Sequence, residues 1–357
     1  MATGWPMKTT YANGDVYSAS DVNDITGTIN LLGSSVAYTA GKNKIINGDF
    51  GIWQRGTTLS LTTNIGAYLA DRFILNWTGT FTGTMSQQTF TPGTAPVSGY
   101  EGQFFNRIVR TGTTAAAPTF YQKVENVRTF AGQTATFSFW AKADAARSVG
   151  IQAYQFFGTG GSSATDNTVG TASLTTSWQR FTFTYAIPSV SGKTISTSND
   201  SWMTFYLNLP NSTAFTVDIW GMQLEQGSTA TAFQTATGTI QGELAACQRY
   251  YYRNTGGGAF SGFTWGYATS TTNGYFIIPL PVAMRVNPTS LDFANLQANS
   301  SAGNSYACSN GSLNAAYQST TTGNVEFTLA SSPPAATMLR LISANNVNAY
   351  IGFSAEL

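Results

Sequence analysis

The residue types that most often carry catalysis are scarce in this sequence. Histidine is absent, which excludes Ser-His-Asp and Cys-His nucleophilic systems and removes the commonest transition-metal ligand. The two cysteines, Cys247 and Cys308, do not have the spacing of a zinc site. Residues 158–161 are glycine-rich but lack the following Lys-Ser/Thr and the helical context of a phosphate-binding loop. The remaining candidate chemistry is that of carboxylates, amides and aromatic rings.

The carboxylates do not form an obvious catalytic pair. Cleavage of a glycan requires two carboxylates roughly 5–10 Å apart. The 16 acidic residues are scattered singly along the chain, and no pair stands out. Because two subunits could supply one carboxylate each, a polysaccharide depolymerase remains a less favoured hypothesis. We expect a protein that is not an enzyme.

Aromatic and amide side chains fit sugar recognition better. The C–H faces of a sugar ring rest on aromatic rings, while its hydroxyls need amide or carboxylate partners. Period-two alternation places several such side chains opposite the apolar rows of predicted strands, and we hypothesise that they line a concave glycan-binding surface. The alternative is that they pack under loops or against a neighbouring subunit. The candidates are Tyr121, Trp140, Gln152, Tyr154, Tyr206 and Asn208.

Two further aromatic candidates, Trp265 and Tyr267, lie in a glycine-rich stretch, residues 259–275. Exposed aromatic side chains on loops are typical of recognition tips. They are equally typical of the core between subunits of a trimer. The sequence leaves both interpretations open.

The composition predicts the elements that must position these side chains. Only 9% of residues are charged, against roughly 25% in an ordinary domain, while 42% are hydrophobic and 13% aromatic. Thr, Gly, Ser and Asn, which suit pleated surfaces and turns, replace the missing charge. Rows such as Met203, Phe205 and Leu207 alternate with Thr204, Tyr206 and Asn208, as in a sheet with one buried face.

The predicted fold is all-β: a jelly-roll β-sandwich with a short N-terminal helix and a smaller C-terminal β-sandwich domain. The expected parts are an attachment and trimerisation segment (1–43), the jelly roll (44–238), a helical linker (239–254) and the C-terminal domain (255–357). In the first part, apolar residues spaced by three and four predict a helical stripe for self-association or for docking onto another protein, or alternatively for packing on its own chain. They are Val22, Ile25, Ile29 and Leu32.

The net charge and the cysteines limit the partners and the cellular compartment that we expect. A net charge of +1 provides no basic field for nucleic acid, and no apolar run approaches the roughly 20 residues that cross a bilayer. The first residues show no secretory signal, although the composition resembles that of extracellular proteins. A virion protein that is assembled in a bacterial cytoplasm and then released would explain both the missing signal and the composition. We favour two buried reduced thiols over a disulfide between Cys247 and Cys308.

Several short strings in order carry a family resemblance. They are NGDF at 47–50, WQRG at 53–56, ADRF at 70–73, FWAK at 139–142, WQRF at 178–181, QLEQG at 223–227, CQRYY at 247–251, NPT at 287–289 and AEL at 355–357. Over residues 44–357, this series resembles phage tail-fibre and receptor-binding proteins with a jelly-roll domain like that of carbohydrate-binding modules. Residues 14–16 and 19–23 are similar to the virion-attachment end of such proteins.

The resemblance implies a homotrimeric virion protein, attached through its N-terminus to other virion proteins. It also implies a structural calcium, for which Asp49 and Asp218 are the candidates; we expect no other cofactor. The predicted function is host attachment, as a tail fibre or receptor-binding subunit that adheres to cell-surface glycans with avidity. The alternative is a capsid-decorating head fibre or a baseplate component without a host ligand.

Overall fold

The computed structural model describes residues 39–62, 66–97, 99–114 and 116–357. Residues Gly41–Leu357 form one compact unit. The predicted N-terminal helix, with Val22, Ile25, Ile29 and Leu32, lies outside the described residues, so it stays a prediction. The predicted domain boundaries also stay predictions.

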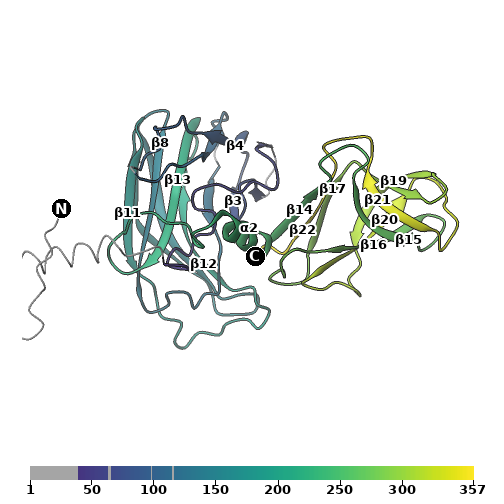
Figure 1. Ribbon diagram of the computed structural model, residues 1–357. Helices are drawn as coiled ribbons and strands as arrows, with labels where there is room; N and C mark the ends of the chain where they lie inside the picture. The colour runs from purple at the N-terminus through teal and green to yellow at the C-terminus, as the bar shows by residue number, and fades with distance from the viewer. Residues whose placement is uncertain (1–38, 63–65, 98, 115) are drawn as a thin grey trace, which may run out of the picture. The chain divides into compact units, whose positions relative to one another are not determined.

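The all-β prediction is confirmed, and the first part of the unit is a sandwich of two antiparallel sheets (Figure 1). The first sheet contains, in spatial order, β1 (Thr58–Leu61), β4 (Gly83–Thr89), β5 (Phe104–Arg110), β13 (Phe215–Gln226), β8 (Thr134–Ala143) and β11 (Gln179–Ala186). The second contains β10 (Thr165–Leu174), β9 (Arg147–Phe156), β12 (Trp202–Asn208), β6 (Thr119–Gln122), β3 (Phe73–Asn76) and β2 (Ala67–Tyr68), with β7 (Val124–Glu125) also paired to β12.

The alternation read from the sequence sets which face of each strand is buried. In β12, Met203, Phe205 and Leu207 point into the core between the sheets, so Trp202 and Tyr206 project from the opposite face. Strand β9 follows the same rule, with Val149, Ile151 and Ala153 inside. The outer face of the second sheet is therefore where aromatic side chains collect.

The C-terminal part begins with helix α2 (Ile240–Gln248), which Thr239 caps by accepting a hydrogen bond from the Gly242 amide. A three-stranded sheet then joins β14 (Tyr251–Thr255), β22 (Tyr350–Ser354) and β17 (Ser290–Ala294). Six further strands close into a barrel: β15 (Gly262–Ala268), β16 (Asn273–Pro279), β20 (Thr322–Leu329), β19 (Ser305–Leu313), β18 (Leu296–Ser300) and β21 (Met338–Ser343). After helix α2, this part consists of strands, as expected. Its six-stranded sheet is closed into a barrel, whereas a sandwich would have two open sheets.

A cluster of stacked arginines joins the sandwich to the C-terminal part. The guanidinium of Arg72 is 2% exposed, lies 3.4 Å from the centre of the Tyr250 ring and forms an ion pair with Glu356. Arg55 lies 3.5 Å from the centre of the Tyr251 ring and 3.3 Å from the Glu356 carboxylate. Cation–π stacking and ion pairing together offset the cost of removing these charges from water.

The side chain of Asn43 connects three segments of backbone at the start of the unit. Its carbonyl oxygen accepts from the amides of Ile45 (2.9 Å) and Leu224 (3.0 Å). Its amide group donates to the carbonyls of Met222 (3.1 Å) and Gln234 (3.0 Å). Three of these hydrogen bonds are buried, and the one to Gln234 is partly buried.

Both cysteines are free, as the sequence analysis favoured. Cys247 is buried in helix α2 and Cys308 is half-buried in β19. Across the described residues, no helix has the length and apolarity needed to cross a membrane.

Replacing Asn43 by Ala should lower the free energy of unfolding by at least about 3 kcal/mol, because three buried backbone groups lose their partners at about 1–3 kcal/mol each. Chemical denaturation of the purified protein measures this effect. Asn304→Ala, at an exposed position, is the matched control and should change stability by less than about 0.5 kcal/mol. Equal effects of the two substitutions would contradict the role of Asn43.

The free energy of unfolding should depend on pH through the protonation of Asp71. Burial raises the pKa of Asp71 from 3.8 to about 6, against the opposing effects of Arg55 and of hydrogen bonds from Gln54. Because the folded protein binds this proton more tightly than the unfolded chain, the stabilising contribution is complete below pH 3.8 and is lost as the pH rises through about 6. The stability of the wild type relative to Asp71→Asn should therefore fall between these two pH values. Denaturation of both proteins across the range tests this, and a constant difference would contradict it.

Candidate functional site

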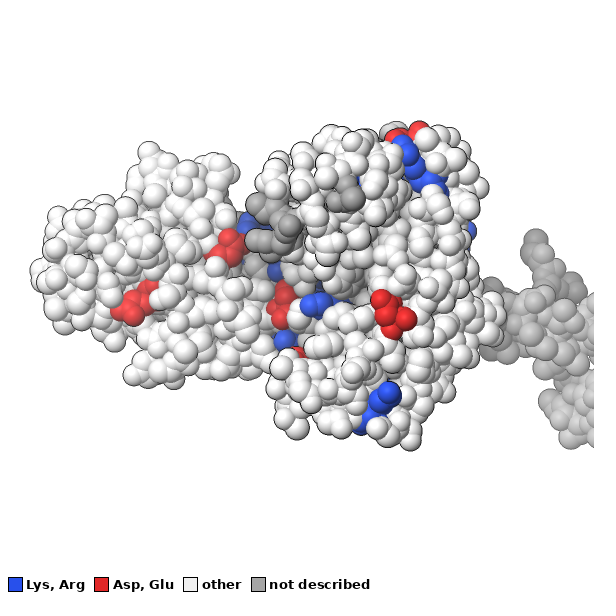
Figure 2. All heavy atoms as spheres, turned by 180° about the vertical axis from the view of Figure 1, so that it is seen from behind, with Lys and Arg blue, Asp and Glu red and all other residues white. Residues whose placement is uncertain are grey.

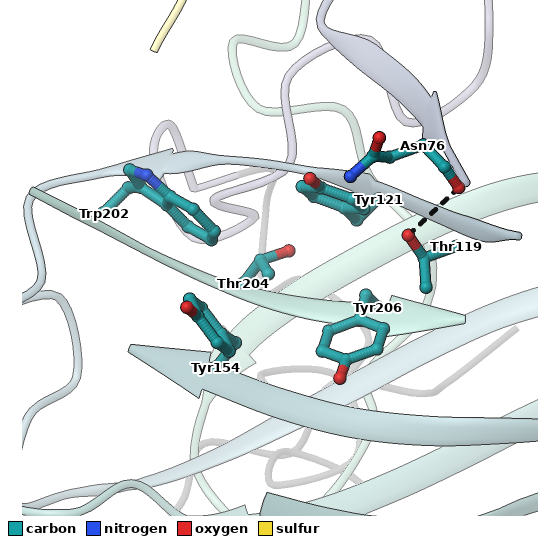
Figure 3. A pocket seen from close by; sticks show the side chains of 7 residues that line it. All are labelled: Asn76, Thr119, Tyr121, Tyr154, Trp202, Thr204 and Tyr206. Atoms are coloured by element: carbon teal, nitrogen blue, oxygen red, sulfur yellow. Dashed lines mark hydrogen bonds between the residues drawn. The ribbon is translucent and has the colours of Figure 1, made fainter. Parts of the chain in front are cut away.

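The outer face of the second sheet carries a pocket with a volume of about 280 Å³ (Figure 3). Strands β3, β6, β9 and β12 supply its walls. The residues that line it are Asn76, Thr119, Tyr121, Tyr154, Trp202, Thr204 and Tyr206. Four of these are aromatic, and in Figure 3 their rings surround Thr204. We call this group the aromatic pocket.

Neighbouring strands set the spacing of the rings. The Trp202 ring is stacked with Tyr154 at 5.1 Å between centroids and with Tyr121 at 6.2 Å. Tyr206 is paired across the sheet with Tyr121, and their rings are tilted at 56°. Such ring packing holds the walls in place and leaves apolar surface open to a ligand.

A buried, hydrogen-bonded threonine forms the floor of the aromatic pocket. Thr204 is 1% exposed, and its hydroxyl donates to the Gln122 carbonyl at 2.7 Å. At one edge, the Thr119 hydroxyl donates to the Asn76 carbonyl at 3.3 Å. Burial raises the pKa of Tyr121, and a hydrogen bond with the Asn76 side chain opposes the shift. Polar groups are therefore present at the floor and edge of a mainly apolar hollow.

A polar cluster flanks the pocket on the side of strand β10. The Tyr206 hydroxyl lies 2.8 and 2.9 Å from the two carboxylate oxygens of Asp166, and it also contacts Oε1 of Gln152. Burial, followed by the hydrogen bond with Asp166, raises the pKa of Tyr206. We call Asp166, Tyr206 and Gln152 the acidic rim.

Lys123 lies beside another wall, with its ammonium 5.1 Å from the centre of the Trp202 ring. The ammonium donates to the Leu357 carbonyl, so the end of the C-terminal part reaches this face of the sandwich. Burial lowers the pKa of Lys123, while the charge of Glu356 opposes the shift.

Most of the sandwich residues predicted from the sequence share this face. Tyr121, Tyr154 and Tyr206 line the aromatic pocket, and Gln152 belongs to its acidic rim. Asn208 projects from the same face of β12, opposite Gly150, but does not line the pocket.

The placement of Trp140 on an open binding surface is wrong. Trp140 lies in β8 of the other sheet and is only 7% exposed, because its ring packs against Trp220 and Phe233. A bulge in β13 makes room for it: a Cβ on Gly221, whose φ is +64°, would lie 2.6 Å from the Trp140 ring.

Trp265 and Tyr267 belong to strand β15 of the barrel instead of a loop. They are 60% and 49% exposed and border a separate hollow of about 390 Å³, together with Ile277 and Met338. The structure therefore does not bring them into the aromatic pocket.

The two calcium candidates have other partners. Both carboxylate oxygens of Asp218 accept from Arg107, at 2.7 and 2.8 Å, and one carboxylate oxygen of Asp49 accepts from the Tyr100 hydroxyl at 2.8 Å. Within the part of the chain that the structure describes, no cluster of three or more Cys, Asp or Glu residues could hold a metal. Asp218 therefore forms an ion pair with Arg107, and the binding of a structural calcium stays a prediction.

Sequence reasoning missed five site residues: Trp202, Asn76, Thr119, Thr204 and Asp166. The signal for Trp202 was available, because the alternation that buries Met203 and Phe205 places Trp202 on the same face as Tyr206. Asp166 gave no such signal, because its position depends on its pairing with Tyr154 across β9 and β10.

Known proteins resemble this chain only in part. No family model matches the chain, and no curated protein matches it. Among solved structures, a CBM4 structure has 20% identity and a TM-score of 0.31, over 51% of this chain and 98% of that chain. The CBM22-1 xylan-binding domain from Paenibacillus barcinonensis Xyn10C has 13% identity and a TM-score of 0.31, over 54% and 100%. The enzymatically active domain of bacteriophage CBA120 tailspike protein 4 has 14% identity and a TM-score of 0.34, over 52% and 22%.

Trp140→Ala should lower the free energy of unfolding by about 3–5 kcal/mol, as expected for a buried aromatic residue replaced by Ala. Trp265→Ala removes the same side chain from an exposed position and should have an effect below about 1 kcal/mol. Denaturant unfolding of both variants makes the comparison. Similar losses of stability would contradict the assignment of Trp140 to the core.

Proposed function

We propose that this chain is a glycan-binding adhesion subunit, and that the aromatic pocket is its binding site. The observation that carries the proposal is the convergence of Tyr121, Tyr154, Trp202 and Tyr206 around one hollow. Aromatic rings bind the C–H faces of sugars, and the polar edge and acidic rim provide partners for sugar hydroxyls.

The proposed activity is binding without hydrolysis. The residues that line the aromatic pocket include no Asp or Glu, and the rim contributes one carboxylate, Asp166. Cleavage of a glycosidic bond commonly uses two carboxylates on opposite sides of the bond. This arrangement supports an adhesin over a depolymerase, and incubation of the purified protein with host polysaccharide should release no oligosaccharides.

We further propose that the protein acts in a phage virion, as a tail fibre or receptor-binding subunit. The support is the ordered series of sequence strings between residues 44 and 357, which resembles such proteins. Charged side chains are also sparse on the face seen in Figure 2, and both signs occur there, so this face offers no basic patch for nucleic acid. A homotrimer attached to other virion proteins by its N-terminal segment would add avidity to weak single sites.

Trp202→Ala and Tyr154→Ala should each reduce binding to host cells at least about tenfold, because each removes an aromatic wall worth roughly 1–2 kcal/mol or more. Binding of fluorescently labelled protein to host cells measures the loss, and circular dichroism verifies that the fold is kept. Tyr317→Ala removes an exposed aromatic side chain outside the aromatic pocket and is the matched control. If both pocket variants bind host cells as tightly as the wild type does, the aromatic pocket is not the binding site.

A further inference from the structure

The acidic rim gathers acceptor oxygens around one hydroxyl group. Three acceptor oxygens, Oε1 of Gln152 and both carboxylate oxygens of Asp166, surround the hydroxyl of Tyr206. Tyr206 has a single hydroxyl proton, which can serve only one of them fully. A ligand that brings donors to this edge therefore gains hydrogen bonds, and a ligand that brings only acceptors does not.

The carboxylate of Asp166 is also without a cationic partner. Among the residues that the structure describes, no Lys or Arg forms an ion pair with it, whereas Asp144, Asp218 and Asp292 each have one. The effect of its charge extends into the aromatic pocket. Burial raises the pKa of Tyr154, and the negative charge of Asp166 raises it further.

The basic group beside Trp202 already has a hydrogen-bond partner. The ammonium of Lys123 donates to the Leu357 carbonyl and lies over Trp202, a residue that is not part of the acidic rim. Lys123 belongs to the β6 side of the sheet, while Asp166 belongs to β10, with β12 and β9 between them. The two charges therefore act on different parts of a bound glycan.

We propose that the aromatic pocket selects glycans that carry a free amino group, with the ammonium of an amino sugar placed at Asp166. This inference rests on the proposed function and names the class of sugar that the site takes. An ammonium has three donors and no acceptor, which matches the acceptor oxygens gathered at the rim. Its hydrogen bonds to a carboxylate are charge-assisted.

Titration calorimetry with the full chain tests the proposal. The probes are β-1,4-linked hexamers of glucosamine, N-acetylglucosamine and glucose, at about pH 6, where the amines are protonated. The glucosamine hexamer should bind at least about tenfold more tightly than the other two, which corresponds to one charge-assisted contact. Higher salt should reduce this preference, because the contact is partly exposed.

Asp166→Asn keeps the shape of the side chain, removes its charge and lies at an exposed position of β10. It should remove the preference for the glucosamine hexamer, because the lost charge lowers the affinity for the charged hexamer more than the affinities for the two neutral hexamers. Asp144→Asn removes one negative charge outside the pocket and should leave the preference intact.

The outcomes separate this inference from the proposed function. If the glucosamine hexamer binds no more tightly than the glucose hexamer, or if Asp166→Asn keeps the preference, the inference is overturned. The proposed function still stands in that case, provided that Trp202→Ala reduces binding to host cells. If Trp202→Ala and Tyr154→Ala both leave host binding unchanged, the proposed function fails and the inference fails with it.

Discussion

The buried guanidinium of Arg72 is the interaction on which the two parts of this structure depend. Its charge is compensated by Glu356, by the face of Tyr250 and by the carbonyl of Lys123, to which it donates at 2.8 Å. A buried charge left without partners costs several kcal/mol, so the last residues of the chain must return to the sandwich. The joint is consequently part of the fold, because buried side chains of both parts contact each other there.

The same joint borders the aromatic pocket. Lys123 accepts from Arg72 through its carbonyl and donates to Leu357 through its ammonium, so both ends of this residue are held by the joint. Its side chain lies over Trp202, a wall of the pocket. Fold and site are therefore coupled through one residue, and the C-terminal part helps to shape a surface that belongs to the sandwich.

The sequence was informative where one local pattern decides the structure. Alternation predicted the strands and placed Tyr121, Tyr154 and Tyr206 on a common side, and the all-β class is confirmed. Alternation cannot show what covers a face, which is why Trp140 was misplaced: residues distant in sequence, Trp220 and Phe233, enclose it. Asp166 and the closure of the barrel depend on strand pairing over long distances, which no local pattern encodes. Side chains at the joint come from several of the strings that carried the family resemblance, including WQRG, ADRF and AEL. These strings therefore indicate a shared fold more than a shared ligand.

Closure of the six C-terminal strands has a consequence for crowded assemblies. An open sheet ends in unpaired amide and carbonyl groups, which can template the addition of a strand from a neighbouring molecule. In the barrel, β15 and β21 pair with each other, so the ring offers no such template. Trp265 and Met338 are exposed on this barrel, where every strand is already paired on both sides. Their exposure therefore does not lead to the strand-addition aggregation that is typical of apolar edge strands.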